Sequence, residues 1–398
     1  MKQQQGNQIF TKRFISLFLT NMSVFFVFYG LTTTLPLYAI NSLGRTDAES
    51  GLLVTAFLLS AIIVRPFCGK LLDLYGKKRM LVWGIALYVV CTALYLFVTP
   101  FTLLLALRFF QGIWFSMVTT ATGSLAADIV PKNRKGAGLG YFAMSTNLAV
   151  VIGPFAALLL IQSFSYDVMF IVMSVVVVIG GLIALTIHTE DIPKASVENR
   201  SLKFKFNDLF ERKALPIAGL ALLIAFSYSS VLSFLSLYAE QKDLLAVASY
   251  FYAVFAAAML LSRPFTGKIY DTLGAKFVIY PSFVLFAAGL VMLAFANGIM
   301  LFLVSAIFIG IGYGTLTTSF QTLCVQSTSA ARSGYATATY FTLFDIGIAA
   351  GSYIFGMVAL TYSYTAVYEV AAAILIVVFA GFHVVNRKAI EARKALHI

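Results

Sequence analysis

Charged residues are scarce in this chain: they make up 11% of its 398 residues, against 60% hydrophobic residues. Soluble globular domains carry about 25% charged residues, so this composition excludes an ordinary water-soluble protein. Cysteine and histidine are also few, three of each, and their positions show neither a disulfide framework nor metal-ligand spacing. We therefore expect no metal site and no cofactor. The sequence lacks a Gly-x4-Gly-Lys-Ser/Thr phosphate loop, which excludes an ATP-driven pump of that type.

Long apolar stretches fill most of the chain, and its mean hydropathy is +0.91. A helix of about twenty apolar residues crosses the ~30 Å hydrocarbon core of a bilayer. The sequence therefore predicts an all-α membrane protein with twelve transmembrane helices. The predicted spans are residues 14–38, 51–72, 80–98, 101–128, 136–162, 166–187, 215–239, 247–269, 276–296, 299–326, 334–357 and 363–385.

The net charge of +12 is distributed unevenly between the two sides of these spans. With the N-terminus in the cytoplasm, 23 of the 28 Lys and Arg residues fall on the inner side, and Arg45 and Lys242 fall on the outer side. Arg65, Arg108 and Arg263 lie inside spans. This bias predicts a multi-pass protein of the cell membrane with both termini cytoplasmic. Because topology explains the basic excess, we expect no nucleic-acid partner.

A fourteen-residue segment occurs twice, at 65–78 and at 263–276, with eight identical positions and an offset of 198. The same offset maps Gly112 onto Gly310 and Gly153 onto Gly351. Such a parallel repeat predicts two related halves that meet along a pathway normal to the bilayer. We expect six-helix bundles at 1–187 and 215–398, the second with a cytoplasmic tail, joined by a cytoplasmic linker at 188–214.

The loop between the second and third spans, residues 69–79, reads Gly-Lys-Leu-Leu-Asp-Leu-Tyr-Gly-Lys-Lys-Arg. In this loop and in its repeat, the chain resembles the major facilitator superfamily and, within it, the twelve-span drug–proton antiporters. Lys77 stands where that family usually has arginine. The resemblance implies the major facilitator fold of two pseudo-symmetric six-helix bundles, and a secondary transporter that works by alternating access.

We expect the same loop to form part of a cytoplasmic gate, although it could serve only to anchor the topology. Gly69 allows helices to approach closely, and Gly76 can end the second span in a left-handed conformation. Asp73 can pair with Lys77 one turn later. The resemblance implies that Asp128 is a partner for the basic residues of the loop. The predicted gate residues are Gly69, Asp73, Gly76, Lys77, Arg79, Asp128, Arg134, Gly267 and Asp271.

Arg108 belongs to a Leu104-x-x-x-Arg108-x-x-Gln111-Gly112 pattern, which is similar to a pattern of the same family. It lies ~10 Å from the outer end of its span. An unpaired arginine at such a depth costs at least ~2.5–3.5 kcal/mol. The repeat places Ala306 at the equivalent position, so the fold does not demand this charge. We expect a role in proton coupling or conformational pairing, or a structural role as a hydrogen-bond donor to backbone carbonyls.

Gly140, Gly153 and Pro154 in the fifth span resemble the glycine-rich signature of the antiporters, with Ala149 and Ala157 in place of two glycines. Small residues permit close helix packing, and the proline can bend the helix. Because this signature separates exporters from importers in the superfamily, Gly153 and Pro154 favour export over import.

Asp345 lies ~16 Å into the eleventh span, close to the bilayer midplane. Desolvation there favours the protonated carboxyl, which suits a proton carrier; the alternative is a protonated hydrogen-bond donor between helices. The repeat places Asn147 at the equivalent position, so we expect the two side chains to mark facing polar sites. Glu369 near the outer end of the last span is explained equally well by proton coupling and by an interfacial position.

Polar and aromatic residues interrupt the spans that line the central cavity in this fold. Aromatic residues make up 15% of the chain, and a cavity with few fixed charges suits amphipathic or lipophilic cationic compounds. The predicted cavity residues are Asn21, Gln111, Trp114, Asn147, Tyr228, Tyr313 and Gln321.

The sequence therefore predicts proton-coupled efflux of drug-like small molecules, with H⁺, the substrate and the lipid bilayer as partners of a monomer. The alternative is a proton-coupled transporter of one defined metabolite, such as a sugar, nucleoside or siderophore-like compound. A membrane enzyme would need clustered nucleophiles, paired carboxylates or metal ligands, and the sequence shows none of these patterns, so we expect no enzyme. A sensor on the same fold is a further reading, which a transport measurement in vesicles would separate.

Overall fold

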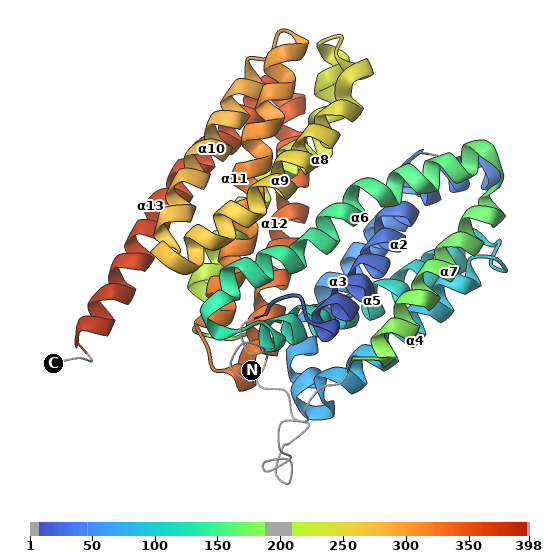
Figure 1. Cartoon of the computed structure of the whole chain (residues 1–398). Coiled ribbons are helices and arrows are strands. Elements are labelled where there is room, and N and C mark those ends of the chain that lie inside the picture. The colour runs from blue at the N-terminus through green and yellow to red at the C-terminus, as the bar shows by residue number, and fades with distance from the viewer. Residues whose placement is uncertain (1–7, 46, 188–208, 396–398) are drawn as a thin grey trace. The chain divides into compact units, whose positions relative to one another are not determined.

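The computed structural model describes residues 8–45, 47–187 and 209–395, and this part of the chain is helical without a strand (Figure 1). Twelve long helices, joined in two places by short 3₁₀ turns, correspond one to one to the twelve predicted spans, so that prediction is confirmed. The long helices are α2 Lys12–Leu43, α3 Asp47–Tyr75, α4 Lys77–Leu94, α5 Phe101–Ile129, α6 Lys135–Ser163, α7 Tyr166–Leu185, α8 Leu215–Gln241, α9 Leu245–Leu273, α10 Lys276–Ala294, α11 Ile299–Gln326, α12 Ser333–Thr361 and α13 Tyr364–Ala395. The 3₁₀ turns are η1 Lys132–Arg134 and η4 Ala330–Arg332.

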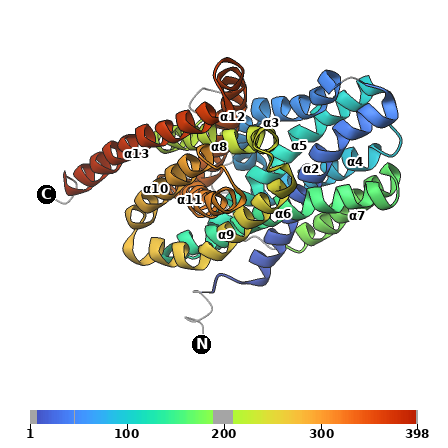
Figure 2. The ribbon, with the colours of Figure 1, turned by 90° about the horizontal axis from the view of Figure 1, so that it is seen from above.

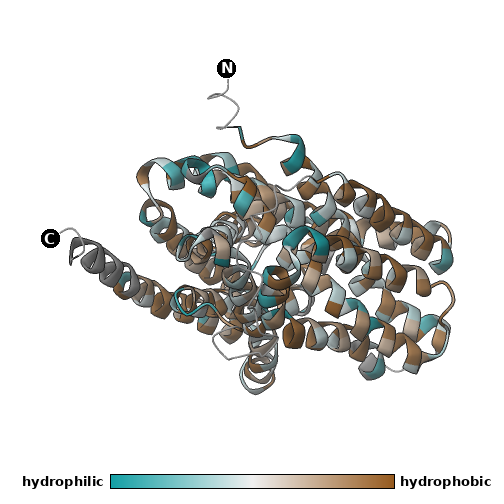
Figure 3. Cartoon of the chain, turned by 90° about the horizontal axis from the view of Figure 1, so that it is seen from below, coloured by the Kyte–Doolittle hydropathy of each residue, from teal (hydrophilic) through white to brown (hydrophobic). Residues whose placement is uncertain are grey.

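Ten of these helices are long and apolar enough to cross a membrane. The exceptions among the described helices are α4, whose 18 residues begin with three cations, and α9, which contains Arg263, Lys268 and Asp271. Figure 3 shows hydrophobic residues along most of the helical ribbon. The last helix continues ten residues past its predicted limit at 385, because the polar residues that follow are good helix formers.

The chain divides into two compact units, and their boundaries cross two helices. Unit 1 comprises Met1–Lys132, Phe142–Glu211 and Ser329–Thr339; unit 2 comprises Asn133–Tyr141, Arg212–Thr328 and Tyr340–Ile398. The start of α12 thus groups with the first half of the sequence, and the start of α6 with the second half.

The same neighbours recur in both units, as Figures 1 and 2 show for the helices that contact each other. In unit 1, α5 packs against α3 and α4, and α7 packs against α2 and α4. In unit 2, α11 packs against α9 and α10, and α13 packs against α8 and α10. The sequence repeat is therefore also a repeat of packing.

Glycines at repeated positions explain how closely these helices approach. A Cβ atom added at Gly112 of α5 would lie 2.4 Å from the Phe57 carbonyl oxygen of α3, and one at Gly310 of α11 would lie 2.5 Å from that of Phe255 of α9. Real Cβ atoms do not come so near, so each contact requires glycine. Gly76 and its repeat partner Gly274 lie between successive helices with φ of 88° and 97°, a positive φ that favours glycine as expected at Gly76. Their ψ values of 137° and 163° lie outside the left-handed helical region, so the backbone is not the left-handed helix cap that was predicted.

Candidate gating and transport sites

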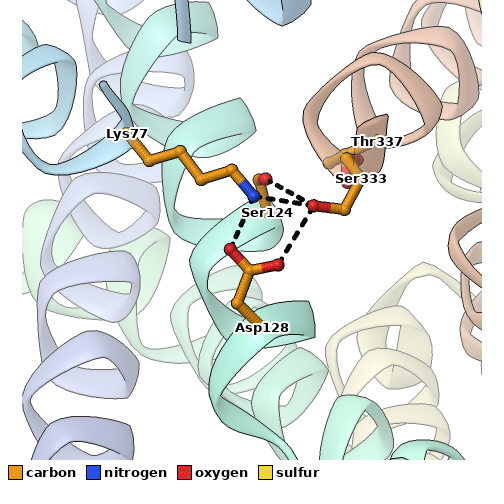
Figure 4. A network of polar contacts seen from close by, with 5 residues as sticks. All are labelled: Lys77, Ser124, Asp128, Ser333 and Thr337. Atoms are coloured by element: carbon orange, nitrogen blue, oxygen red, sulfur yellow. Dashed lines mark hydrogen bonds and ion pairs between the residues drawn. The ribbon is translucent and has the colours of Figure 1, made fainter. Parts of the chain in front are cut away.

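Lys77 at the start of α4 forms an ion pair with Asp128 near the end of α5, with Nζ and Oδ2 2.5 Å apart. The hydroxyl group of Ser333, the first residue of α12, accepts a hydrogen bond from Lys77 at 2.7 Å and donates one to Asp128 at 3.1 Å (Figure 4). The Ser124 hydroxyl of α5 lies 3.3 Å from that of Ser333. The ion pair implied for Asp128 is present, whereas the pairing of Lys77 with Asp73 is wrong, because the ammonium group reaches across to α5.

Two further residues of the loop contact the start of α12. The Tyr335 hydroxyl donates a hydrogen bond to the Asp73 carboxylate at 3.4 Å. A Cβ atom at Gly69 would lie 2.9 Å from the Tyr335 Cα atom, so a side chain there would push the two helices apart. We define the first-loop contact, which lies within unit 1, as Gly69, Asp73, Lys77, Asp128, Ser333 and Tyr335.

The segment that carries Ser333 is also held by the end of the linker. The Arg332 Nε atom binds the carboxylate of Glu211, which is 5% exposed. The Arg332 guanidinium lies 4.4 Å from the centroid of the Tyr335 ring, and the Glu211 amide donates to the Thr339 hydroxyl at 2.8 Å. Residues 329–339 are therefore fixed in unit 1 by the loop and by the linker end. The rest of the linker, residues 188–208, lies outside the described residues.

In unit 2 the equivalent loop contacts the start of α6. The carboxylate of Asp271 accepts hydrogen bonds from the backbone amides of Gly136 at 2.8 Å and Ala137 at 3.0 Å. These amides belong to the first turn of the helix, where the helix dipole favours a negative charge. A Cβ atom at Gly267 would lie 2.7 Å from the Ala137 Cα atom. We define the second-loop contact as Gly267, Asp271, Gly136 and Ala137.

The remaining predicted gate residues lie at the ends of helices or in the turns between them. Arg79 and Arg134 are exposed, and Gly76 lies in the turn between α3 and α4. The contact that sequence reasoning missed is the one from Asp271 to two backbone amides.

Arg108 of α5 is completely buried and is held by neutral groups. It donates to Gln111 Oε1 at 2.9 Å and to the Thr32 hydroxyl at 2.8 Å, and its Cζ atom lies 4.5 Å from the Phe57 ring centroid. Within the described residues, no carboxylate pairs with it, and its Nε atom has no hydrogen-bond partner. We expected backbone carbonyls as the acceptors if Arg108 had a structural role, but the acceptors are side-chain oxygens. Gln111 is further fixed by Tyr95, whose hydroxyl donates to it at 2.8 Å.

The polar positions predicted near the midplane differ in their surroundings. Asp345 in α12 and Asn147 in α6 are both half-buried, and the first belongs to unit 2 and the second to unit 1. The Asn147 Nδ2 atom is buried without a hydrogen-bond partner among the described residues. Glu369 in α13 is exposed. The facing arrangement of Asp345 and Asn147 and the proton-coupling roles stay predictions.

The residues of the antiporter signature fit close packing inside unit 1. A Cβ atom at Gly153 would lie 2.7 Å from the Phe26 carbonyl oxygen of α2, and Pro154 lies inside the continuous helix α6. The repeat partner Gly351 is equally close to the Phe226 carbonyl oxygen in unit 2. Because both halves keep this packing, Gly153 has a structural role that is independent of the direction of transport.

Some predicted cavity residues are committed to structural hydrogen bonds. Asn21 of α2 accepts from the Thr122 hydroxyl at 2.8 Å and donates to the Ser145 hydroxyl at 2.8 Å, which joins three helices. Gln111 is fixed by Arg108 and Tyr95. Gln321 is 7% exposed, and Trp114 is half-buried.

Aromatic residues form a cluster in each unit at repeated positions. In unit 2, the rings of Tyr228 and Tyr313 stack with centroids 3.7 Å apart, and Phe255 and Phe286 lie within 6.2 Å and 5.7 Å of Tyr313. In unit 1, Phe28 stacks on Phe57 at 4.9 Å and on Phe115 at 4.7 Å. Sequence reasoning missed the unit 1 cluster. The offset of 198 could have found it, because it maps Phe57 onto Phe255 and Phe115 onto Tyr313.

Within the described residues, no group of three His, Cys, Asp or Glu side chains could hold a metal ion. Cys68, Cys91 and Cys324 are all buried as free thiols.

Comparison with known proteins agrees with this architecture. An MFS-type transporter of Methanocaldococcus jannaschii, MJ1560, whose name calls it uncharacterized, is 28% identical over 90% of this chain and 97% of that protein. The quinolone resistance protein NorA of Staphylococcus aureus is 32% identical over 35% of this chain and 36% of NorA, so that likeness spans about a third of each protein.

Two solved structures share the fold over 93% of this chain and 98% of theirs. The human organic anion transporter MFSD10 matches with a TM-score of 0.80 at 14% identity, and the transporter FucP in its outward conformation with 0.75 at 15% identity. The family model of the Major Facilitator Superfamily matches residues 17–352 and 245–395. This chain is therefore a multi-pass membrane transporter of the major facilitator superfamily.

Proposed function

We propose that this transporter exports drug-like or amphipathic small molecules from the cell in exchange for protons. The observation that carries the proposal is Asp345, a half-buried carboxylate in the middle of the apolar helix α12. Acidic side chains inside membrane helices are rare and typical of proton relays, so we propose that Asp345 takes up a proton and releases it when the site opens to water. Its repeat partner Asn147 has an amide side chain that cannot carry a proton in this way. We therefore propose that only the second half of the chain binds the proton.

The first-loop and second-loop contacts act as the cytoplasmic gate. Each holds the start of a helix whose remaining residues belong to the other unit: α12 for the first contact and α6 for the second. Alternating access requires the cytoplasmic side to open, and opening requires these starts to leave Gly69 and Gly267. The cost of breaking Lys77 from Asp128, and Asp271 from two amides, then sets how often the gate opens.

The two aromatic clusters support an amphipathic substrate. Flat aromatic rings bind varied apolar compounds and cations without a fixed set of hydrogen bonds. Apart from Phe28, which is half-buried, the rings of these clusters are at most 9% exposed, so a substrate reaches them only when the rings move apart. Tyr228 and Tyr313 also carry hydroxyl groups that can orient a polar substituent. The partial likeness to a quinolone resistance protein supports export of this class of compound. Because one chain supplies both clusters, we propose that a monomer in the cell membrane is the working unit, with both termini cytoplasmic as the charge bias indicates.

The test is transport by the full-length protein in proteoliposomes with an imposed proton gradient and the fluorescent cation ethidium as probe. The wild-type protein should accumulate ethidium against its gradient. Asp345→Asn should lose accumulation but retain exchange of ethidium down a gradient, because alternating access itself does not need that proton. Glu369→Gln is the matched control, since its carboxylate is exposed. Accumulation by Asp345→Asn at near the wild-type rate would contradict proton coupling through this residue.

A second candidate substrate class is organic anions. Two arginines within the helices, Arg108 and Arg263, are at most 2% exposed and form no ion pair with a carboxylate of the described residues, and this buried positive charge favours an anion over a cation. A counterflow assay with amphipathic anions and cations of matched size separates the two. Counterflow of the anions alone would show that the substrates are organic anions and not cations. Counterflow of neither class would favour a transporter of one defined metabolite.

A further inference from the structure

A small polar cavity lies inside unit 2, between α9, α11 and the start of α6. Its volume is about 10 Å³, which is the room that a single water-sized species needs. Arg263 of α9 lines it, together with hydroxyl groups and with glycines that leave the space open. The lining residues are Gly136, Gly140, Arg263, Thr266, Gly267, Tyr270, Thr315, Thr318, Ser319 and Thr322.

Two of the polar groups that line the cavity have no hydrogen-bond partner among the described residues. Arg263 is 2% exposed and donates from Nη1 to the Thr318 hydroxyl, but its Nε atom has no partner among the described residues. The hydroxyl of Thr315, which is 1% exposed, is also without a partner there. Nor does any carboxylate of the described chain pair with Arg263. The nearest acidic residue along α9, Asp271, is engaged by the amides of α6.

The repeat shows that this polar lining is not required by the fold. Arg65 occupies the position of Arg263 in the first half, but Met117 stands where Thr315 stands in the second half. The other replacements also remove hydroxyl groups. In the first half, Cys68, Leu72 and Ala121 stand in place of Thr266, Tyr270 and Ser319.

We propose that this cavity binds one small inorganic anion of the size of chloride. An anion accepts hydrogen bonds from the Arg263 Nε atom and from the Thr315 and Ser319 hydroxyls, and it neutralises a guanidinium that is otherwise buried without a counter-charge. A water molecule of similar size would satisfy some of the donors but would leave the charge uncompensated. The volume excludes an organic substrate, so the site is distinct from the transport pathway proposed above.

The cavity also ties anion binding to the second-loop contact. Gly136 and Gly140 close it from the side of α6, next to Gly267 of α9. When the start of α6 leaves α9, the cavity loses that wall. The anion therefore binds the closed second-loop contact more tightly than the open one and stabilises it.

The test uses the purified full-length protein in nanodiscs. Its thermal unfolding midpoint is followed in sodium gluconate as chloride or bromide replaces gluconate at constant ionic strength. The wild-type midpoint should rise saturably with either halide. Thr315→Val, which removes the unpartnered hydroxyl at nearly constant volume, should need at least fivefold more halide for half the rise. Arg263→Gln should show no rise.

Thr317→Val is the matched control, because it is the same substitution on the same helix and its hydroxyl already donates to the Gly314 carbonyl at 2.8 Å. It should keep the wild-type halide response. If Arg263→Gln does not fold, anomalous scattering from bromide in crystals of the wild-type protein decides, and a bromide peak beside Arg263 is expected. A wild-type midpoint without a saturable halide response, an equal response in Thr315→Val, or a water molecule in place of bromide would each overturn the proposal.

Discussion

The first-loop and second-loop contacts share one backbone arrangement but use different chemistry. In both, a glycine of the loop helix lies against the Cα atom of a residue in the first turn of another helix: Gly69 against Tyr335, and Gly267 against Ala137. These pairs are related by the same offset of 198. The first contact then adds an ion pair between side chains, whereas the second adds a carboxylate that binds backbone amides.

This difference shows which part of the contact the repeat preserves. Close approach of two helices depends on a missing side chain, and both halves keep that glycine. The polar groups differ between the halves. The side chains of Lys77 and Asp128 are 14% and 27% exposed, so salt ions reach that pair. The two hydrogen bonds to Asp271 instead lie against a helix terminus. We expect the two contacts to respond differently to mutation and to ionic strength.

The largest effect should come from filling the shared glycine. Gly267→Val places a Cβ atom 2.7 Å from the Ala137 Cα atom, so the second-loop contact cannot close and ethidium transport should fall by more than tenfold. Transport per folded molecule in proteoliposomes measures this. Gly219→Val is the control, because no atom lies within 4 Å of the added Cβ there. Equal activity of the two variants would show that the close approach is dispensable.

Removing the Asp271 carboxylate from the helix terminus should have the next largest effect. Asp271→Ala leaves the two partly buried amides of Gly136 and Ala137 without acceptors. Each unsatisfied amide destabilises the closed contact by about 1–3 kcal/mol. Asp128→Ala removes a partly exposed ion pair worth ~0–1 kcal/mol. The labelling rate of Gly140→Cys by a membrane-impermeant maleimide, in a chain whose native cysteines are replaced by alanine, reports opening of the second-loop contact. It should rise clearly in Asp271→Ala and little in Asp128→Ala; the reverse order would break the comparison.

The smallest effect should come from Ser333→Ala. The substitution removes the hydroxyl that bridges Lys77 and Asp128 but leaves the ion pair, so the first-loop contact should lose only ~0.5 kcal/mol, the low end for a hydrogen bond. The weakened contact should also become more sensitive to salt, because the remaining attraction is between partly exposed charges. Transport measured at low and high ionic strength checks this. A loss as large as that of Gly267→Val would mean that the hydroxyl, and not the glycine, holds the contact.

Much of the architecture was predictable because it depends on local patterns. Apolar length predicted all twelve helices, and the repeat predicted that Gly69 and Gly267 have equivalent roles. The partners of charged residues were harder to predict. Lys77 has Asp73 one turn away, but the fold places Asp128 within reach. Local spacing favoured Asp73, and only the family resemblance pointed to Asp128.

Contacts to the backbone left even less signal in the sequence. Asp271 binds amides of Gly136 and Ala137, and backbone amides carry no residue identity that a pattern could detect. Arg108 was recognised as costly, and its partner Gln111 lies one turn away on the same helix, but its second partner Thr32 lies on α2 and becomes visible only after the helices pack. The residues within one helix were therefore predictable, and the choice of partners between helices was not.

Proton release on substrate binding tests the central claim, that Asp345 carries the exchanged proton, most directly. Ethidium is added to the purified full-length protein in weakly buffered solution, and the pH change is recorded for the wild type, Asp345→Asn and Glu369→Gln. The account predicts proton release by the wild type and by Glu369→Gln, and none by Asp345→Asn although ethidium still binds. Release by Asp345→Asn equal to that of the wild type would contradict it.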